Sequence, residues 1–454
     1  MVKKPYSQYD LAPDLSKATR HKVRDLMKER LPKEIRELLK RIGRVGDELN
    51  MGVYVVGGFV RDLLLGIENL DIDIVVEGKG IALAQKLAKE LGGEAKRFPE
   101  FGTAVVILPD GFKIDVATAR TEFYEYPAAL PRVEFASLKQ DLYRRDFTIN
   151  SMAIRLNRKG LGDLIDFYGG ERDLKKKVVR VLYNLSFVED PTRIFRAIRF
   201  EQRYGFRIDP QTRGFIENAL GEGLFERLGN ERMRDELILI LNEKKPLGAI
   251  RRMKEFRVLR YIHPEIRLNK RIVRILEEIE RRREEYKRML KGEKVSWWLV
   301  NLLALMEDLD LSRTRQLAKR FKFKRKNFDK IIASKEIEKH LIHELSGRKR
   351  MLPSTIYKRL TKLPLEVLLL ILSKSKSPRL KERVILYLTD LRKARIKITG
   401  EDLKELGLKP GPQFKRVLDK VFEARLDGKV KSKGEEKALA KKLIGKRNVL
   451  HYLD

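Results

Sequence analysis

Cysteine is absent from the 454-residue sequence, so disulfides and thiolate-bound zinc are excluded. The five histidines form neither an HExxH motif nor a His-Asp pair, which argues against a histidine-based metal phosphohydrolase. No GxxxxGK(S/T) sequence is present, so the chain carries no phosphate-binding loop of the P-loop type.

Long apolar runs are also missing. The longest, Trp297–Met306 and Leu365–Leu372, fall far short of the roughly 20 residues that cross a bilayer. The first ten residues, MVKKPYSQYD, lack the apolar core of a signal peptide. We therefore expect a cytoplasmic protein without a membrane partner, and we favour a monomer, although the sequence leaves the oligomeric state open.

What the chain has in excess is positive charge. It contains 100 Lys and Arg against 65 Asp and Glu, a formal net charge of +35, which predicts a polyanionic partner such as nucleic acid. A thermophile surface would also explain the 36% charged residues and the sparse Asn and Gln, but not the excess of one sign. The length corresponds to about three domains, and 43% hydrophobic residues are enough for their cores.

The most informative stretch reads GGFVRDLLLGIENLDID, from Gly57 to Asp73. An apolar run at residues 53–56 predicts a buried strand that ends at the paired glycines. Residues 60–65 suit a short helix that Gly66 ends, and residues 71–76 suit a second buried strand. The pattern predicts a strand, a glycine turn, a helix and a strand.

Asp71 and Asp73 are the candidate metal ligands. Residues i and i+2 of a strand share a face, so the two carboxylates project together. Two neighbouring like charges are unfavourable unless a cation lies between them, and hard oxygen ligands suit Mg²⁺. A glycine turn before an acidic strand edge is the plain alternative, but the combination of GG, RD and DxD favours a nucleotide and metal site.

These residues resemble a known family. The GGFVRD and DID motifs are similar to the head of the class II tRNA nucleotidyltransferases, the CCA-adding enzymes, and of bacterial poly(A) polymerases within the polymerase-β superfamily. The resemblance extends from about residue 50 to 265, with a weaker match near the C-terminus. It implies catalytic carboxylates at Asp71 and Asp73 and nucleotide binding by Gly57, Gly58, Arg61 and Asp62.

A predicted hairpin, residues 103–108 and 112–116 around a Pro-Asp-Gly turn, carries Asp115 on the face opposite its apolar residues. The family has an acidic residue here, so the resemblance implies that Asp115 is a third catalytic carboxylate. The preceding FPEFGT is similar to the tRNA nucleotidyltransferase version of this region and favours tRNA as substrate. Arg120 is a further candidate for nucleotide binding, and residues 121–140 read as a loop beside the site.

The sequence RRDFTIN, residues 144–150, matches a family motif that holds the ribose and triphosphate. The resemblance therefore implies nucleotide binding by Arg145, Asp146 and Asn150. Guanidinium groups suit phosphate oxygens, and an Asp or Asn suits a ribose hydroxyl. As bare composition, such a cluster would more often be a solvated surface group.

The sequence EDPTR, residues 189–193, matches the family's base-selecting motif. On one helix, Glu189 and Asp190 would meet Arg193 at i,i+4 and i,i+3 spacing, and Arg196 and Arg199 would continue the row. A carboxylate that accepts from an amino group, beside a guanidinium that donates to a ring nitrogen, fits cytosine and adenine but not uracil or guanine. The resemblance assigns this role to Asp190 and Arg193, with Glu189 supporting Arg193; a surface ion pair is the plain alternative.

These features together predict an α+β fold: a small mixed β-sheet head with helices, followed by an all-α neck, body and tail. We expect a helical leader at 1–50, the head at 51–180, the neck at 181–265, the body at 266–395 and a tail at 396–454. The GEDL and LGLKPGP sequences near the end resemble the family's tail, which grips the tRNA elbow. Residues 429–447 are polar, and we expect partial disorder there.

The resemblance implies a template-independent enzyme that adds CMP and AMP from CTP and ATP to the tRNA 3′ end, as CCA, with Mg²⁺ held by Asp71 and Asp73. The alternatives are a CC-adding or A-adding specialist, then a poly(A) polymerase, and then a noncatalytic tRNA-binding protein.

Overall fold

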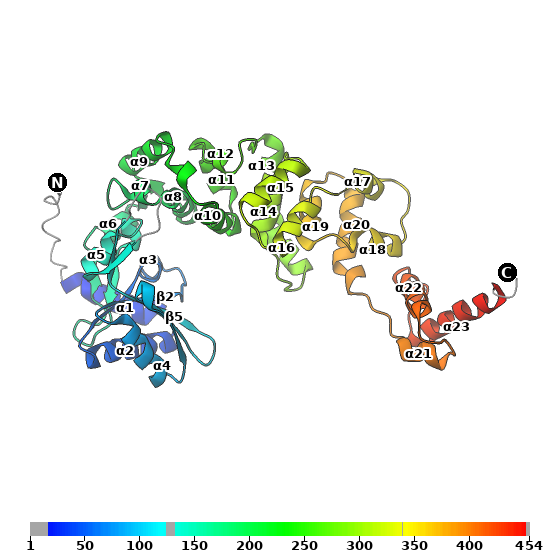
Figure 1. The fold of residues 1–454 in the computed structure, drawn as a ribbon, viewed down its shortest axis with the longest axis horizontal. Coiled ribbons are helices and arrows are strands. Elements are labelled where there is room, and N and C mark those ends of the chain that lie inside the picture. Colours follow the sequence, from blue (N-terminus) through cyan, green and yellow to red (C-terminus); the bar gives the residue numbers. More distant parts are fainter. Residues whose placement is uncertain (1–16, 124–131, 338, 451–454) are drawn as a thin grey trace. The chain divides into compact units, whose positions relative to one another are not determined.

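The structure is a computed structural model that describes residues 17–123, 132–337 and 339–450. Its chain divides into two compact units, Met1–Glu236 and Leu237–Asp454. The first unit contains the β-sheet, and the second is built from helices (Figure 1). The expected α+β fold, with a mixed-sheet head before a helical remainder, is confirmed.

Helices and strands are mixed in the first unit. Their bounds are α1 Lys17–Arg30, α2 Lys33–Glu48, β1 Gly52–Val56, α3 Gly58–Leu65, β2 Ile72–Glu77, α4 Gly80–Glu90, β3 Glu94–Phe98, η1 Pro99–Phe101, β4 Thr103–Ile107, β5 Lys113–Thr118, β6 Arg120–Phe123, β7 Arg132–Phe135, α5 Leu138–Tyr143, η2 Thr148–Asn150, β8 Ala153–Arg155, β9 Leu164–Ile165, α6 Gly170–Lys175, β10 Val178–Val179, α7 Ser186–Glu189, α8 Thr192–Tyr204, β11 Arg207–Ile208, α9 Pro210–Gly221, η3 Leu224–Arg227 and α10 Asn230–Asn242, which runs across the division between the units.

In the described part of this unit, the main sheet has seven strands in the order β3-β4-β5-β2-β1-β8-β9. β2 and β5 are parallel, and the other neighbours are antiparallel. The predicted hairpin is therefore confirmed as β4 and β5. The parallel pair matters for the site, because its register places Asp73 directly beside Asp115.

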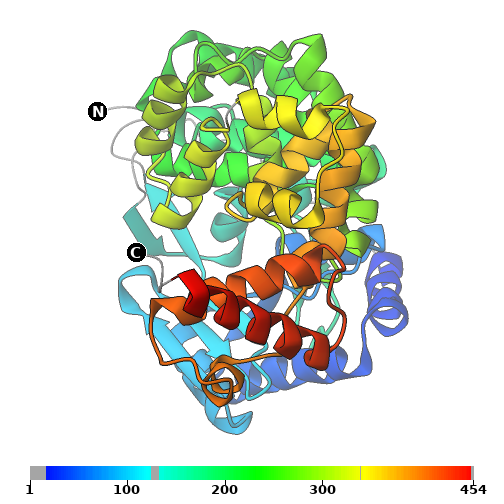
Figure 2. The ribbon, with the colours of Figure 1, turned by 90° about the vertical axis from the view of Figure 1, so that its right-hand side faces the viewer.

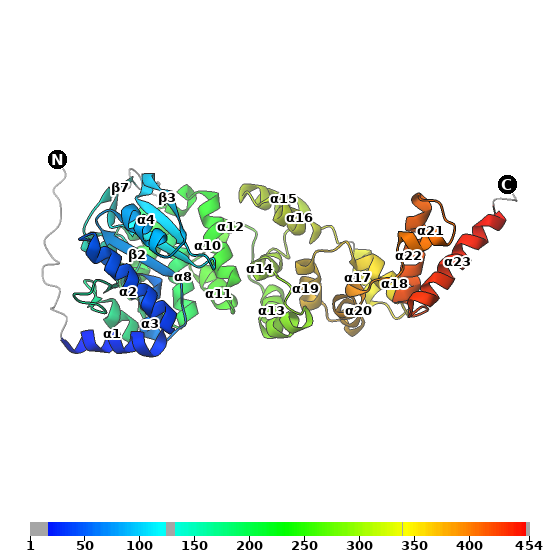
Figure 3. The same ribbon diagram turned by 90° about the horizontal axis from the view of Figure 1, so that it is seen from below.

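Both faces of the sheet are covered by helices. Alternate residues of a strand point to opposite faces, and on β1 the side chain of Val53 lies against Gly46 of α2. α4 packs beside α2 and against β4 and β5 (Figure 3). On the opposite face, Tyr54 and Val56 form a buried cluster with residues of α5. The central strands are thus buried on both sides, as their apolar runs predict.

The expectation of a loop over residues 121–140 is wrong for the described part of that stretch. β6 and β7 pair antiparallel as a separate two-stranded sheet, with Arg120 opposite Phe135. Ser137 then caps α5 through a capping box with Gln140. Thr, Val and Phe favour strands, whereas the prolines of this stretch favoured the expectation of a loop. Residues 124–131 lie outside the described residues.

Helices form the second unit. Their bounds are α11 Leu247–Glu255, α12 Leu259–Ile262, α13 Lys270–Met289, α14 Trp297–Leu305, α15 Leu311–Arg320, α16 Arg325–Ala333, α17 Lys339–Ser346, α18 Pro353–Leu360, α19 Leu365–Lys374, α20 Pro378–Thr389, η4 Leu391–Lys393, α21 Gly400–Glu405, α22 Pro412–Leu426 and α23 Lys433–Leu450.

The apolar runs of this unit form a helical core. α19 contacts both α13 and α14. Farther along, α22 and α23 lie side by side (Figure 2), and Leu403, Val421 and Ala440 are buried between the last helices. The expected partial disorder of residues 429–447 is wrong over most of that range, because α23 packs its Ala and Leu residues into this cluster. Among the described residues, no helix is long and apolar enough to cross a membrane.

Candidate functional site

The predicted strand, glycine turn and helix form one wall of the site. Gly57 ends β1 with φ 70° and ψ −131°, a conformation that favours glycine, and α3 follows until Gly66 ends it in the left-handed region. A Cβ on Gly57 would lie 2.9 Å from Nη1 of Arg145 and 3.8 Å from Oδ2 of Asp73. The missing side chain therefore lets an arginine and a carboxylate approach the turn.

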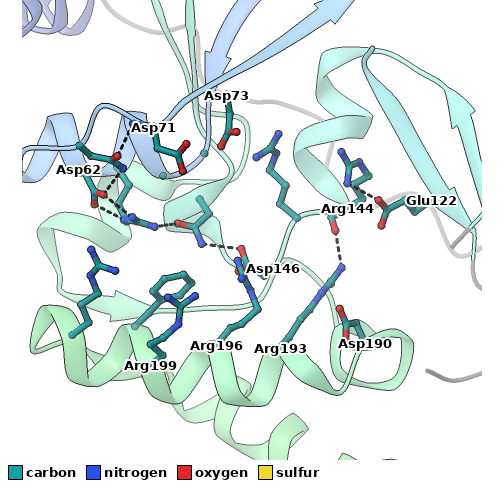
Figure 4. A pocket seen from close by; sticks show the side chains of 18 of the residues that line it. Asp62, Asp71, Asp73, Glu122, Arg144, Asp146, Asp190, Arg193, Arg196 and Arg199 are labelled. Carbon is teal, nitrogen blue, oxygen red and sulfur yellow. Dashed lines mark hydrogen bonds and ion pairs between the residues drawn. The ribbon is translucent and has the colours of Figure 1, made fainter. Parts of the chain in front are cut away.

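A cavity of about 560 Å³ opens beside this turn and carries balanced charge (Figure 4). Carboxylates line it from the sheet, the loops and the start of α8, whereas most of its guanidinium groups come from α8 and from the two residues after α5. The charged lining consists of Asp62, Glu68, Asp71, Asp73, Glu122, Asp146 and Asp190, together with Arg61, Arg144, Arg145, Arg193, Arg196, Arg199 and Arg203.

The acidic edge of the cavity is formed by Asp71 and Asp73, whose side chains both face the cavity, as i,i+2 spacing predicts (Figure 4). Burial, the charge of Asp71 and the charge of Asp115 raise the pKa of Asp73 to about 6, against a lowering by Arg145. Burial and Asp71 also raise the pKa of Asp115. The three carboxylates therefore repel one another across β2 and β5, although Asp115 is exposed and does not line the cavity.

This acidic edge suits a hard cation. Carboxylate oxygens are the ligands that Mg²⁺ prefers, and Mg²⁺ typically takes only one or two carboxylates and completes its shell with water and phosphate. Burial and the neighbouring carboxylates raise the pKa of Asp73 more than Arg145 lowers it. No group of three or more acidic or histidine side chains in the described chain is placed to enclose an ion. The residues fit a metal shared with a phosphate ligand.

Arg61 and Asp62 are both buried and hold each other. Nε and Nη2 of Arg61 donate to the Asp62 carboxylate at 2.8 and 2.9 Å, and Nη1 donates to Asn150 at 2.5 Å. The Arg61 guanidinium also lies over the ring of Tyr204, whose hydroxyl donates to Asp62 at 3.1 Å. Arg61 therefore shapes the floor of the cavity through bonds within the protein.

Asp146 continues this network. Its Oδ1 accepts from Asn150 at 2.9 Å, and its Oδ2 accepts from Nε and Nη2 of Arg196 at 2.8 and 2.6 Å. Burial opposes ionisation of Asp146, but Arg196 and Asn150 hold its pKa below the usual value. The RRDFTIN motif is thus tied to α8 by a buried ion pair.

Arg145 and its neighbour Arg144 are held by Asp141, a residue that the sequence analysis did not select. Asp141 is buried and accepts from Arg144 at 2.8 Å and from Arg145 at 3.1 Å. Arg144 also donates to Glu122 of β6 at 2.7 Å. The i,i+3 and i,i+4 spacing of these residues is a signal that could have identified Asp141. Nothing local in the sequence places Glu122 here, because it comes from a separate sheet.

The EDPTR motif does not form one continuous helix, so that expectation is wrong. α7 ends at Glu189, Asp190 is extended, and α8 begins at Thr192 after Pro191. Asp190 instead accepts from the backbone N–H of Thr192 at 2.9 Å. Proline disfavours the helical conformation in the residue before it, which explains the break. Asp190 and Arg193 nevertheless both line the cavity.

Arg193 is buried and held by three acceptors. Nη1 donates to Ser186 at 2.6 Å and to the Tyr183 hydroxyl at 3.2 Å, and Nη2 donates to the carbonyl of Arg144 at 2.8 Å. The Tyr183 hydroxyl donates in turn to Glu189. Glu189 therefore supports Arg193 through Tyr183, which the sequence analysis also missed.

The remaining predicted residues occupy different places. Arg232 of α10, which the sequence analysis did not select, pairs with Asp190 at 2.8 Å and holds that carboxylate. Arg199 faces the cavity with Arg196, and its guanidinium lies over Phe200 at 5.0 Å. Arg120 does not line the cavity; it donates to the carbonyl of Phe101 at 2.8 Å.

Two known domain families match segments of the chain. The Poly A polymerase head domain matches residues 53–180, and the probable RNA and SrmB-binding site of polymerase A matches residues 205–269. The A-adding tRNA nucleotidyltransferase of Geobacter sulfurreducens is 44% identical over 439 residues, which are 96% of this chain and 50% of that protein. The corresponding enzyme of Halalkalibacterium halodurans is 30% identical over 94% of this chain and 96% of its own length.

A solved structure of a similar protein points to the same family. The Thermotoga maritima CCA-adding enzyme complexed with tRNA has a TM-score of 0.69 and 37% identity, and the match covers 93% of this chain and 98% of that one. The chain spans about half the length of the curated relatives from Geobacter sulfurreducens and Aquifex aeolicus that it matches. The match covers 96% of the Halalkalibacterium enzyme, and two domain families of these polymerases match as well. The chain therefore belongs to the class II tRNA nucleotidyltransferases.

Proposed function

We propose that this protein transfers a nucleotide from a nucleoside triphosphate to the 3′-hydroxyl of tRNA, without a nucleic-acid template. One observation carries the proposal: the acidic pair Asp71 and Asp73 and the base-selecting residues Asp190 and Arg193 line a single cavity. Phosphoryl transfer needs phosphate positioning and stabilisation of charge, and it needs no covalent enzyme intermediate.

Base choice would rest with Asp190 and Arg193. Cytosine and adenine both offer an amino donor beside a ring-nitrogen acceptor, whereas uracil and guanine reverse that order. A carboxylate and a guanidinium held at fixed positions pair with the first two bases and leave buried groups unpaired against the others. Arg193 is fixed by three hydrogen bonds and Asp190 by Arg232, so the pair is rigid enough to discriminate.

The triphosphate would lie between the acidic edge and the arginines. Arg145 lies over the Gly57 turn, close to Asp73, and is placed to donate to phosphate oxygens. Divalent metal use is general in this family, and we assign Mg²⁺ to Asp71 and Asp73, where it would neutralise phosphate charge and activate the attacking hydroxyl when bound. Asp115 would act beside them through its charge.

The partners follow from charge and from the relatives. The net charge of +35 suits a polyanion. The Thermotoga maritima relative is complexed with tRNA, and solved CCA-adding enzymes that are 38% identical to this chain are complexed with ATP and with CTP. We therefore propose tRNA, ATP and CTP as ligands, with the helices of the second unit binding the tRNA acceptor stem and elbow.

Complete CCA addition, with ATP used for the last step, is the principal proposal. The second candidate is an enzyme that adds the terminal A alone. Three curated relatives, which are 44%, 38% and 30% identical, are named A-adding enzymes. ATP use is common to both candidates, and only CTP use separates them.

The test is Mg²⁺-dependent extension of tRNA transcripts that end before the CCA, at C and at CC, each with CTP, ATP or both. Addition of all three bases, followed by a stop, would establish CCA addition. A lone A on the CC transcript would establish the A-adding specialist, and two C residues only would establish a CC-adding one. An unbounded ATP ladder would indicate a poly(A) polymerase and contradict the proposal.

Asp71→Ala provides the control for catalysis. We expect loss of transfer with nearly unchanged tRNA binding in a filter assay, because the carboxylate acts on the reacting phosphate and not on the tRNA body. Unchanged turnover would remove Asp71 from the metal site.

A further inference from the structure

A second cavity, of about 1290 Å³, lies in the first unit and shares no lining residue with the 560 Å³ cavity. It is formed by α5, the segment from β9 to the strand β10, the segment before α7, and α9. Tyr183 lines it with its ring, while its hydroxyl bonds Arg193. The second cavity therefore lies directly behind the base-selecting arginine.

Its wall is unusually rich in aromatic rings. The ring of Tyr143 stacks on that of Tyr183 at 5.1 Å and 25°, and it also contacts Tyr168 at 5.6 Å. Phe167 meets Tyr168 edge-on at 6.1 Å, and Phe215 of α9 adds a further ring from the facing side. Flat rings of this kind stack with nucleobases, each pair contributing about 1–3 kcal/mol. The 560 Å³ cavity has one aromatic lining residue, Phe200.

Positive charge borders this wall. Four cationic side chains line the second cavity against two acidic ones, Asp166 and Glu171. Asp166 is occupied, since its carboxylate accepts from the N–H groups of Gly170 and Glu171 at 2.8 and 2.9 Å. The cationic residues are Arg172, Lys175, Lys176 and Arg180.

The two lysines are the groups best placed to bind an anion. Lys175 and Lys176 are exposed at the end of α6, and Lys175 makes an i,i+4 pair with Glu171 at 2.7 Å, which is weak at an exposed position. Arg180 is more firmly held, by Asp173 and Asp209, both at 3.0 Å. A phosphate could therefore reach the lysines without breaking a buried ion pair.

Polar side chains complete the lining. Asn184 and Gln211 are exposed at the cavity, and their amide groups both donate and accept hydrogen bonds, as the edge of a nucleobase requires. The aromatic wall suits the face of a nucleobase, the amides suit its edge, and the lysines suit a phosphate.

We propose that the second cavity binds a nucleotide unit apart from the transfer reaction, with its base on the Tyr143, Tyr168 and Phe215 rings and its phosphate at Lys175 and Lys176. This chemistry is shared by a free nucleotide and by single-stranded RNA. The site goes beyond the proposed function, because none of its lining residues faces the cavity that contains Asp71 and Asp73.

The experiment uses the full chain, the Lys175→Glu/Lys176→Glu variant, and a matched control, Lys33→Glu/Lys89→Glu. The control lysines are exposed, carry the same charge change and lie outside both cavities. Equilibrium dialysis with radiolabelled ATP measures how many free nucleotides each chain binds. Fluorescence anisotropy with labelled pentaadenylate measures the affinity for single-stranded RNA.

If a free nucleotide is the ligand, we expect about two ATP per chain in the wild type and the control and about one in the double variant. If RNA is the ligand, pentaadenylate affinity falls about tenfold or more in the double variant relative to the control. One ATP per chain throughout, with equal pentaadenylate affinities in the double variant and the control, overturns the proposal.

Phe215→Leu tests the aromatic part. Leucine keeps an apolar side chain but removes the ring face, so we expect the same ligand to bind several-fold more weakly. Transfer of AMP to a CC-ending tRNA at saturating substrate serves as the folding control, because Phe215 does not line the 560 Å³ cavity. Unchanged binding by Phe215→Leu, with transfer intact, would contradict base stacking in the second cavity.

Discussion

The hydroxyl of Tyr183 accepts a hydrogen bond from Nη1 of Arg193 at 3.2 Å. The same hydroxyl donates to Glu189, so one side chain joins the acidic and basic members of the base-selecting motif. Burial raises the pKa of Tyr183, which keeps the hydroxyl protonated and able to donate. Tyr183 is therefore a positioning residue for Arg193.

Tyr183→Phe removes this bridge and keeps the ring. We expect selectivity for ATP over GTP, measured as a ratio of kcat/KM values, to fall about five- to tenfold, corresponding to one hydrogen bond of about 1 kcal/mol. Tyr168→Phe is the matched control, because its hydroxyl donates to the carbonyl of Lys139. Equal selectivity ratios for wild type and Tyr183→Phe would show that Tyr183 does not position Arg193.

Gly57→Ala should damage the site more than Gly58→Ala. Gly57 has φ 70°, and its Cβ would lie 2.9 Å from Nη1 of Arg145, whereas a Cβ on Gly58 would lie 3.4 Å from Arg61 in an ordinary conformation. We expect about 1–2 kcal/mol of lost stability and at least tenfold slower transfer for Gly57→Ala. Thermal unfolding and single-turnover kinetics measure the two effects, and equal behaviour of the two variants would contradict the role of the turn.

Asp73 makes the stability of the metal-free protein depend on pH. Its pKa is about 6 in the folded chain against 3.8 as the ordinary value, so the folded state holds a proton that the unfolded state releases. Stability therefore falls as pH rises from about 4 to above 6, by about 2–3 kcal/mol, and this contribution is absent in Asp73→Asn.

The measurement is thermal unfolding in EDTA at pH 4 and pH 7.5. We expect Asp73→Asn to gain stability relative to wild type as pH rises. Added Mg²⁺ should restore the wild type at pH 7.5 and leave the variant unchanged. A constant difference between the two proteins across this range would mean that Asp73 titrates normally.

Asp146→Ala should be strongly destabilising. Removal of the carboxylate breaks the ion pair with Arg196 at 2.6 Å and leaves Asn150 without its acceptor, while Arg196 keeps Glu236 at 3.5 Å. We expect a cost of about 3 kcal/mol. Asp115→Ala is the comparison, because Asp115 is exposed and its neighbours repel it, so its loss is neutral or stabilising in chemical unfolding. Similar stability of the two variants would show that the Asp146 pair does not support the fold.

The sequence predicts the sheet well because its central strands are apolar runs ended by glycine. The strand, turn and helix around Gly57 and the hairpin that carries Asp115 lie where the pattern places them. The separate β6–β7 sheet was missed because its strands are only four residues each. α23 was missed because its apolar residues, which pack into the cluster of the last helices, are outnumbered by charged ones.

The sequence predicted which residues line the candidate site better than it predicted how they are arranged. Spacing brings Asp71 and Asp73 together, and both face the cavity. Helical spacing misplaced Asp190, because Pro191 disfavours the helical conformation in the residue before it and α8 begins only at Thr192. Asp141 could have been found from its i,i+3 and i,i+4 spacing to Arg144 and Arg145. Glu122 and Tyr183 carry no such signal, and their contacts with the arginines appear only once the chain is folded.

The equal numbers of carboxylates and guanidinium groups around the 560 Å³ cavity have a consequence for how a nucleotide arrives. A surface with a net positive charge attracts an anion from any direction, whereas a neutral surface with separated charges exerts mainly a torque. The long-range attraction of a polyanion must then come from the rest of this basic chain. The cavity determines which end of the incoming triphosphate enters first. Raising the salt concentration should weaken the attraction far more than the orientation, because only the attraction acts across distances longer than the screening length.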